Sequence, residues 1–165
     1  MVDGAVPIGC RSPHRSDLPG ITAMWERCSL ATRIARFHAP VSKIPRSYLT
    51  AVLSDPANSL VAVAEHADAV VALASLIPDG ASSAELGVLV EDGWQRRGIG
   101  RHLVTHLIDA ASANQLTELT ASVLAENPRV AGLLRQVPGD FSMTREGTTL
   151  NVRVRLASAR RAWRA

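Results

Sequence analysis

Apolar residues follow two different periods along the chain, and the change of period separates strands from helices. Continuous apolar runs at 60–64 and 70–74 flank a polar turn at 65–68. Short apolar runs bounded by a turn are typical of paired, buried strands, so this segment predicts a β-hairpin. Two further strands are predicted over 84–91 and 116–125 for the same reason.

Helical periodicity appears in four other segments. After residue 98, apolar residues recur at the spacing of one buried helix face: Leu103, Val104, Leu107, Ile108 and Ala111. A helix is also predicted to begin after Asp17, with Asp17 as its N-cap, and others are predicted over 45–53 and after Asn127. Residues 34–40 are predicted to form a loop or short turn.

The predicted elements follow the order β-α-α-β-β-β-α-β-α-β-β. A short apolar strand over 5–10 opens this order, and strands over 141–145 and 149–156 close it. No internal repeat or low-complexity segment interrupts it. The sequence therefore predicts a single domain over 1–156, followed by a basic, flexible tail over 157–165.

Composition limits the classes of protein that fit this pattern. The chain has 165 residues, of which 47% are apolar and 20% charged, with a formal net charge of +3. These values are typical of a soluble globular domain. Aromatic residues are scarce and the basic residues are scattered outside the tail, so no nucleic-acid partner is expected. No apolar run reaches the roughly 20 residues of a membrane span, and no signal-peptide pattern opens the chain.

Two cysteines, Cys10 and Cys28, are too few for a disulfide framework. We expect both to be free thiols in a reducing compartment. With no membrane segment or secretion signal in the pattern, the expected location is the cytoplasm.

A glycine-spaced turn follows directly after the strand predicted over 84–91. It reads Gln95-Arg96-Arg97-Gly98-Ile99-Gly100-Arg101. A turn between a strand and a helix aims free backbone N–H groups and the positive end of the helix dipole at an anion. Glycines let the main chain approach a phosphate closely, and arginines add positive charge. The turn therefore predicts a phosphorylated ligand, and the alternative is a glycine turn with no ligand.

Two better-known phosphate loops do not fit this spacing. A Walker A loop needs lysine and then serine or threonine after its second glycine, whereas Arg101 and His102 follow Gly100. A dinucleotide-binding loop needs a third glycine where Leu103 stands.

The remaining pattern, Gln-x-x-Gly-x-Gly at a strand-to-helix junction, resembles the pyrophosphate-binding motif of the GCN5-related N-acetyltransferases (GNAT family). The predicted order of elements also resembles that family over nearly the whole chain. The resemblance implies an α/β fold: a mixed, mostly antiparallel sheet with helices on both faces and a central parallel pair of strands that splays apart. It implies acetyl-CoA as cosubstrate, with its pantetheine arm between the splayed strands, and no metal. The cofactor contacts that it implies are Val88, Leu89, Val90, Gln95, Arg96, Arg97, Gly98, Ile99, Gly100, Arg101 and Asn127.

The segments 85–95 and 123–127 also resemble the bacterial protein-lysine acetyltransferases, which regulate enzymes such as acyl-CoA synthetases. The pair Arg36-Phe37 is similar to that group too. A strand glutamate ten residues before the glutamine is the general base there, which implies that role for Glu85. The resemblance further implies that the Val88 N–H polarises the thioester carbonyl.

The chemistry supports a base at this position. A lysine amine has a solution pKa near 10.4, so it must lose a proton before it attacks a thioester. We expect Glu85 to be half-buried on its strand; the alternative is a solvent-facing carboxylate. Glu91 and Asp92 are expected to be turn residues.

Three other positions complete the expectations for the site. Asn127 has two expected roles, as an N-cap of the helix opened by Pro128 and as a neighbour of the pantetheine arm. Many relatives carry a tyrosine seven residues later to protonate the leaving thiolate, but this chain has Leu134. His102 and His106 lie off the apolar stripe without a third ligand, so they are expected to face solvent rather than bind a metal.

The sequence thus predicts an enzyme that transfers an acetyl group from acetyl-CoA directly to a primary amine. The leading acceptor is a lysine on a protein such as an acyl-CoA synthetase, and a small-molecule amine is the second hypothesis. A third hypothesis, from another class, is a non-catalytic module that senses acyl-CoA.

Overall fold

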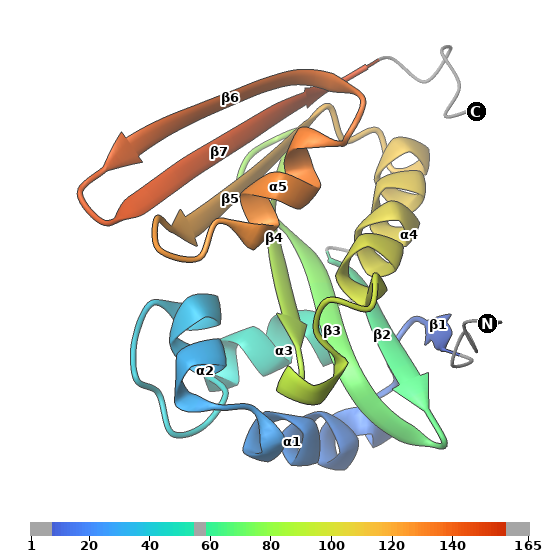
Figure 1. Cartoon of the computed structure of the whole chain (residues 1–165). Coiled ribbons are helices and arrows are strands. Elements are labelled where there is room, and N and C mark those ends of the chain that lie inside the picture. Colours follow the sequence, from blue (N-terminus) through green and yellow to red (C-terminus); the bar gives the residue numbers. More distant parts are fainter. Residues whose placement is uncertain (1–7, 55–58, 158–165) are drawn as a thin grey trace, which may run out of the picture.

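A seven-stranded sheet organises the chain, with strands in the order β1-β2-β3-β4-β5-β7-β6 (Figure 1). The computed structural model describes residues 8–54 and 59–157. The strands span Gly9–Arg11 (β1), Leu60–His66 (β2), Ala69–Pro78 (β3), Ser83–Val90 (β4), Glu118–Leu124 (β5), Gly139–Glu146 (β6) and Thr149–Leu156 (β7). The α-helices span Leu18–Arg27 (α1), Leu30–Phe37 (α2), Arg46–Ser54 (α3), Ile99–Ala113 (α4) and Arg129–Arg135 (α5). Two 3-10 turns span Arg15–Asp17 (η1) and Asp92–Trp94 (η2).

All neighbouring strands are antiparallel except β4 and β5, which are parallel. The predicted fold class is confirmed. The predicted hairpin is also confirmed: β2 and β3 are joined by Ala67 and Asp68, both with positive φ (47° and 62°). Two positive φ angles in a two-residue turn match the right-handed twist of the flanking strands.

Helices cover both faces of the sheet, and each face has its own hydrophobic core. On one face, α4 and α5 bury Leu103, Leu107 and Leu134 against the strands. On the other, α1 and α3 bury residues such as Trp25 and Tyr48. Neighbouring side chains of β4 point to opposite faces, so Leu86 lies in the first core and Leu89 in the second. The sheet therefore separates the two hydrophobic cores, and β4 contributes side chains to both.

The parallel pair separates soon after it begins. Residues 83–85 of β4 pair with 118–120 of β5, and no pair between the two strands is formed beyond Glu85 and Thr120. Strand β4 continues to Val90 on β3, and β5 continues to Leu124 on β7. The predicted splay is thus confirmed.

One predicted loop is a helix. The segment 34–40 was expected to be a loop or turn, but residues up to Phe37 belong to α2. Ser29 caps this helix, because its hydroxyl oxygen accepts a hydrogen bond from the Thr32 N–H at 3.2 Å. His38 ends the helix in the left-handed conformation, with φ of 56°. None of the residues of α2 is fully buried, whereas the apolar stripe of α4 is buried in the core.

Asp17 occupies the N-cap position of α1 as predicted, but the prediction of Asn127 as the N-cap of α5 was wrong. The Asp17 carboxylate makes no capping bond to α1; it accepts hydrogen bonds from the His14 N–H at 2.6 Å and from the Arg11 guanidinium at 2.7 Å. Pro128 stands at the N-cap of α5, and its carbonyl accepts the first helical bond, from Gly132. The side chain of Asn127 is therefore available to the space beside the helix.

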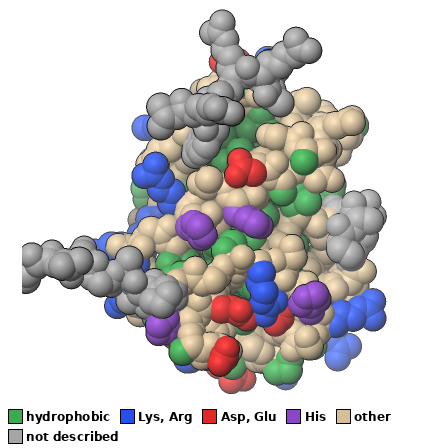
Figure 2. All heavy atoms as spheres, turned by 90° about the vertical axis from the view of Figure 1, so that its right-hand side faces the viewer, with side chains coloured by type: hydrophobic (Ala, Val, Ile, Leu, Met, Phe, Trp, Pro, Cys, Tyr) green, Lys and Arg blue, Asp and Glu red, His purple; other side chains and the backbone are tan. Residues whose placement is uncertain are grey.

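Parts of two expectations lie outside the described residues. The first predicted strand begins at residue 5, whereas the described chain begins at residue 8, and nearly all of the predicted tail lies beyond residue 157. Within 8–54 and 59–157, no helix combines the length and apolar character that a bilayer crossing requires. On the face formed around α4, acidic, basic and histidine side chains are interspersed among the described residues (Figure 2).

Candidate active site

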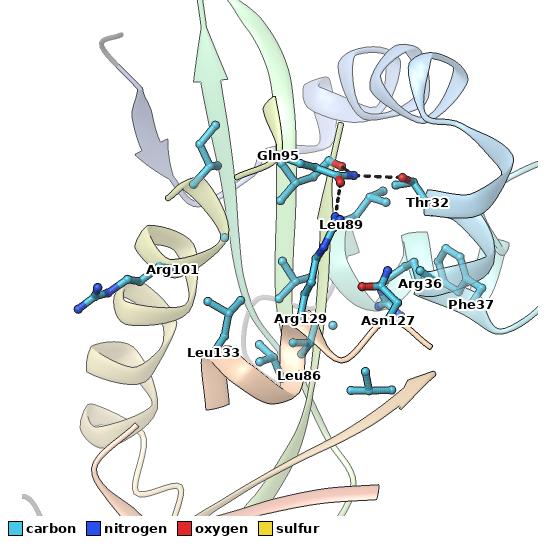
Figure 3. A pocket seen from close by; sticks show the side chains of 18 of the residues that line it. Thr32, Arg36, Phe37, Leu86, Leu89, Gln95, Arg101, Asn127, Arg129 and Leu133 are labelled. Carbon is cyan, nitrogen blue, oxygen red and sulfur yellow. Dashed lines mark hydrogen bonds between the residues drawn. The ribbon is translucent and has the colours of Figure 1, made fainter. Parts of the chain in front are cut away.

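A cavity of about 470 Å³ occupies the gap that opens between β4 and β5. Its walls come from β4, the first turn of α4, the side of α2, and the start of α5 (Figure 3). The volume is within the range of small-molecule and cofactor sites. Eleven of the predicted site residues line it: Glu85, Val88, Leu89, Val90, Gln95, Arg96, Gly98, Ile99, Gly100, Arg101 and Asn127.

The remaining predicted residue, Arg97, is not part of this lining. Its guanidinium stacks on the ring of Trp94, 5.1 Å from the ring centroid. Arg101 lines the cavity, but its side chain extends away from the sheet (Figure 3). The side chains of Arg97 and Arg101 therefore do not converge with Arg96 on one anion.

The first turn of α4 presents backbone donors to one end of the cavity. Gly98 precedes the helix with φ of +79°, and Arg96 also has a positive φ, of 59°. His102 is the first residue whose N–H bonds back along the helix, to the Gly98 carbonyl at 3.0 Å. The N–H groups of 99–101 have no intrahelical partner. This arrangement can bind an anion such as a pyrophosphate.

Gly100 brings the start of α4 close to β4. A Cβ built at this position would lie 3.8 Å from the Val88 side chain, 3.9 Å from Val90 and 3.5 Å from Leu133. These are ordinary contact distances, so the glycine permits a close approach without being the sole residue that fits. The anion-binding turn is thus held directly against the strand that lines the cavity.

Backbone groups of β4 face the gap because β5 has moved away. The N–H of Glu91 donates to Val71 of β3 at 3.0 Å. Because backbone groups alternate in direction along a strand, those of Val88 and Val90 point to the other side, toward the cavity. The Val90 carbonyl accepts a hydrogen bond from Gln95 Nε2 at 3.0 Å. The Val88 N–H faces the same space, where an amide-bearing or carbonyl-bearing ligand could pair with it.

Gln95 connects three walls of the cavity. Its Nε2 also donates to Thr32 Oγ1 of α2 at 3.1 Å, and its Oε1 accepts from Arg129 of α5 at 2.5 Å (Figure 3). Thr32 in turn donates to Asp92 Oδ1 at 3.0 Å. Neither Thr32 nor Arg129 was predicted, because each lies more than 30 residues from Gln95 and carries no local signal.

Asp92 anchors the start of α2. Burial alone would raise the pKa of its carboxyl, but hydrogen bonds from the Ser29 hydroxyl, the Ser29 N–H and the Thr32 hydroxyl outweigh burial and lower it. Asp92 is therefore a structural turn residue, as expected. Glu91 is held by an ion pair with Arg27 at 2.9 Å.

Glu85 stands where the two strands begin to separate. It lines the cavity and is exposed, not half-buried as expected, because β5 diverges immediately beyond it. His38, at the end of α2, also lines the cavity and was not predicted. Among the described lining residues, only these two have a carboxylate or imidazole side chain that can act as a general base.

Within residues 8–54 and 59–157, no cysteine and no tyrosine lines the cavity. Leu134 is fully buried in the core, and the Tyr48 hydroxyl is hydrogen-bonded to Ser75 Oγ at 3.0 Å. Burial raises the pKa of the Cys28 thiol to about 11, with smaller contributions from Asp92 and Glu91, and burial also raises the pKa of Cys10. Such thiols are poor nucleophiles at neutral pH.

His102 and His106 are both exposed on α4, outside the cavity lining. The two imidazoles are therefore on the solvent side of that helix.

Comparison with known proteins places this geometry in a family. Residues 22–137 match the acetyltransferase (GNAT) family. A search of curated protein sequences finds no significant match. Among solved structures, the GNAT domain of PAT from S. lividans superposes with a TM-score of 0.79 at 19% identity, covering 89% of each chain. yncA, a putative acetyltransferase from Salmonella typhimurium solved with its cofactor acetyl-CoA, has a TM-score of 0.71 at 18% identity, covering 93% of this chain and 96% of that one.

A third similar structure is the ribosomal-protein-S18-alanine N-acetyltransferase from Escherichia coli. It has a TM-score of 0.64 at 17% identity and covers 96% of this chain and 99% of that one. At these identities the structures establish a shared fold, and the family match covers well over half of the sequence, including β4, the glycine turn and α5. The chain belongs to the acetyltransferase (GNAT) family.

Proposed function

We propose that the protein transfers the acetyl group of acetyl-CoA to a primary amine, with a protein lysine as the leading acceptor. The observation that carries the proposal is the cavity between the splayed strands, with the α4 N-terminus at one end and Glu85 at the other. The pyrophosphate would lie on the N–H groups of 99–101. The pantetheine arm would pair with the free backbone groups of β4.

In this mechanism no covalent enzyme intermediate forms. Glu85 accepts a proton from the acceptor ammonium, directly or through water, and the neutral amine attacks the thioester carbon. The Val88 N–H donates to the carbonyl oxygen as it gains negative charge. The new C–N bond forms, the C–S bond breaks, the nitrogen releases its second proton to solvent to give the amide, and the departing coenzyme A thiolate takes up a proton from solvent. Solvent takes the place of an acid side chain in this mechanism, since no tyrosine stands among the described residues that line the cavity.

Replacing Glu85 with glutamine tests this assignment. Loss of a general base typically costs about 10²- to 10⁴-fold in rate. We expect kcat of Glu85→Gln to fall by this amount, while the Kd for acetyl-CoA stays close to that of the wild type. Glu126→Gln is the matched control, because Glu126 is an exposed glutamate outside the cavity lining. If kcat fell in His38→Asn and not in Glu85→Gln, His38 would be the general base and the assignment of Glu85 would be wrong.

The acceptor class is supported by two observations. The segment 85–95 resembles protein-lysine acetyltransferases, and the chain shares its fold with the GNAT domain of S. lividans PAT. Incubation with labelled acetyl-CoA, a panel of acyl-CoA synthetases and a panel of free amines tests it. Labelled synthetase is the expected result, and labelling of free amines alone would replace the lysine proposal. Binding of acetyl-CoA without any turnover would favour a sensing module. A cytoplasmic location stays a prediction.

A further inference from the structure

Arg36 is held in the wall of the cavity by an unusual set of contacts. Its guanidinium carbon lies 4.6 Å from the ring centroid of Phe37 and 4.6 Å from that of Tyr48. The group also packs against Gly87 of β4: a Cβ built there would be 2.2 Å from Arg36 Nη2 and 2.4 Å from Cζ. Figure 3 shows Arg36 entering between Phe37 and the strands. Contacts on three sides fix the guanidinium in one place.

This guanidinium has no hydrogen-bond acceptor within the described chain. Arg11 and Arg33 are also half-buried, but their N–H groups are bonded to carboxylates or to backbone carbonyls. Arg36 has no such bond and no ion pair. No fully buried polar side-chain atom of the described residues lacks a partner, so the unbonded nitrogens of Arg36 keep exposed surface, and Arg36 lines the cavity. A guanidinium with five donors and none used is a site for an oxyanion.

The Arg36 guanidinium lies on the same face of β4 as the Glu85 side chain. Side chains two apart on a strand share a face, and their Cα atoms are roughly 7 Å apart. Glu85 and Gly87 are such a pair, and the guanidinium covers Gly87. Glu85 and Arg36 are not paired with each other. The two charges therefore stand side by side, one suited to an ammonium and the other to a carboxylate.

We propose that Arg36 binds a carboxylate of the acceptor, so that the preferred substrate carries an acid close to the amine that is acetylated. This inference rests on the proposed function, since it assigns the amine to Glu85. The carboxylate has two sources, an acidic residue beside a lysine or the acid group of a free amino acid. In both, the planar guanidinium offers two parallel N–H donors to the two oxygens.

Matched acceptor pairs test the proposal. One pair consists of blocked lysine peptides that differ only in a glutamate or a glutamine beside the lysine. The other pairs are free amino acids and their amides. We expect the carboxylate member of at least one pair to have the higher kcat/KM, by roughly tenfold, the value of one charge-assisted hydrogen bond. The preferred pair identifies the source. The same compounds are titrated into the CoA-saturated protein, so that preference is also measured without turnover.

Three variants separate recognition from folding. Arg36→Gln should abolish the preference, and Arg36→Lys should keep part of it because it keeps the charge but not the fork. Gly87→Ala should also reduce the preference, since its Cβ displaces the guanidinium while Arg36 is still present. The control is Arg33→Gln, on the same helix, whose guanidinium is bonded to backbone carbonyls outside the cavity lining and should leave the preference intact.

The proposal is overturned if the wild type shows no preference within any pair, or if a preference survives in Arg36→Gln. It is also overturned if Arg36→Gln loses affinity for CoA itself, or alters only the choice between succinyl-CoA and acetyl-CoA, because the residue would then read the cofactor. Failure of the proposed function looks different: the wild type would bind no CoA, or would bind it and acetylate neither member of any pair.

Discussion

Gly98 gives the sharpest test of how the backbone forms the anion site. It is the N-cap of α4, with φ of +79° and ψ of 0°. A Cβ at this position would meet no atom within 4 Å, so the cost of Gly98→Ala lies in the backbone alone. A left-handed conformation costs an alanine about 1–2 kcal/mol. Either the turn keeps its left-handed form in the free protein, which is then destabilised by this strain, or the turn relaxes and the strain returns when CoA binds.

In both cases the complex with CoA is destabilised by the full 1–2 kcal/mol or so, because the ligand requires the turn in its left-handed form. For a domain of this size that corresponds to a fall in Tm of roughly 2–8 °C at saturating CoA. If the turn relaxes in the free protein, the same cost also appears in binding, and the Kd for CoA rises by up to about thirtyfold. Thermal unfolding with and without CoA, together with calorimetric titration, measures both parts.

The control is Gly132→Ala. Gly132 lies inside α5 and has no positive φ, and a Cβ built on it would meet no atom within 4 Å. Alanine is the better helix former by about 1 kcal/mol, so this variant should be as stable as the wild type or more so. If Gly98→Ala formed an equally stable complex with an unchanged Kd, the left-handed turn would not be what shapes the anion site.

Two further predictions concern the polar contacts around the site and the fold. Gln95→Ala should lower the free energy of unfolding by roughly 1–3 kcal/mol in urea titrations, because it removes hydrogen bonds to Thr32, Arg129 and the end of β4. Gln95→Glu keeps the Arg129 bond and should lose less stability. Equal losses in the two variants would contradict this prediction. Hydrogen bonds from Arg11 lower the pKa of Asp17 to about 2, below its unfolded value of 3.8, so they stabilise the fold above about pH 4 and the contribution is lost as the pH falls toward 2. Asp17→Asn should show about 1–2 kcal/mol less change in stability across that window, and an unchanged pH dependence would contradict the assignment.

Much of the fold could be predicted from the sequence where local pattern and tertiary burial agree. The runs in β2 and β3 are buried on both faces, and the stripe on α4 faces the core, so periodicity and burial give the same answer. The glycine turn was predictable because its spacing constrains the backbone directly: Gly98 has the positive φ that a glycine permits.

Where a role depends on tertiary contacts, local pattern was insufficient. Helix α2 has no fully buried residue, and its packing depends on β4, more than 45 positions later. Arg36 acquires its significance from Tyr48 and Gly87, which no local spacing connects to it. Asp17 stands at the N-cap of α1, but its carboxylate is bonded to Arg11 and His14 and not to the helix end. Asn127 is displaced from the N-cap of α5 by Pro128.

The account depends most on where acyl-CoA binds, and a crystal structure of the protein soaked with acetyl-CoA tests this directly. The pantetheine arm should lie between the diverging ends of β4 and β5, with its amides paired to Val88 and Val90, and the pyrophosphate should lie on the N–H groups of 99–101. The thioester carbonyl should lie within hydrogen-bond distance of the Val88 N–H, with open space toward Glu85. Density for acetyl-CoA elsewhere on the molecule, or a gap closed by neighbouring side chains, would contradict the account.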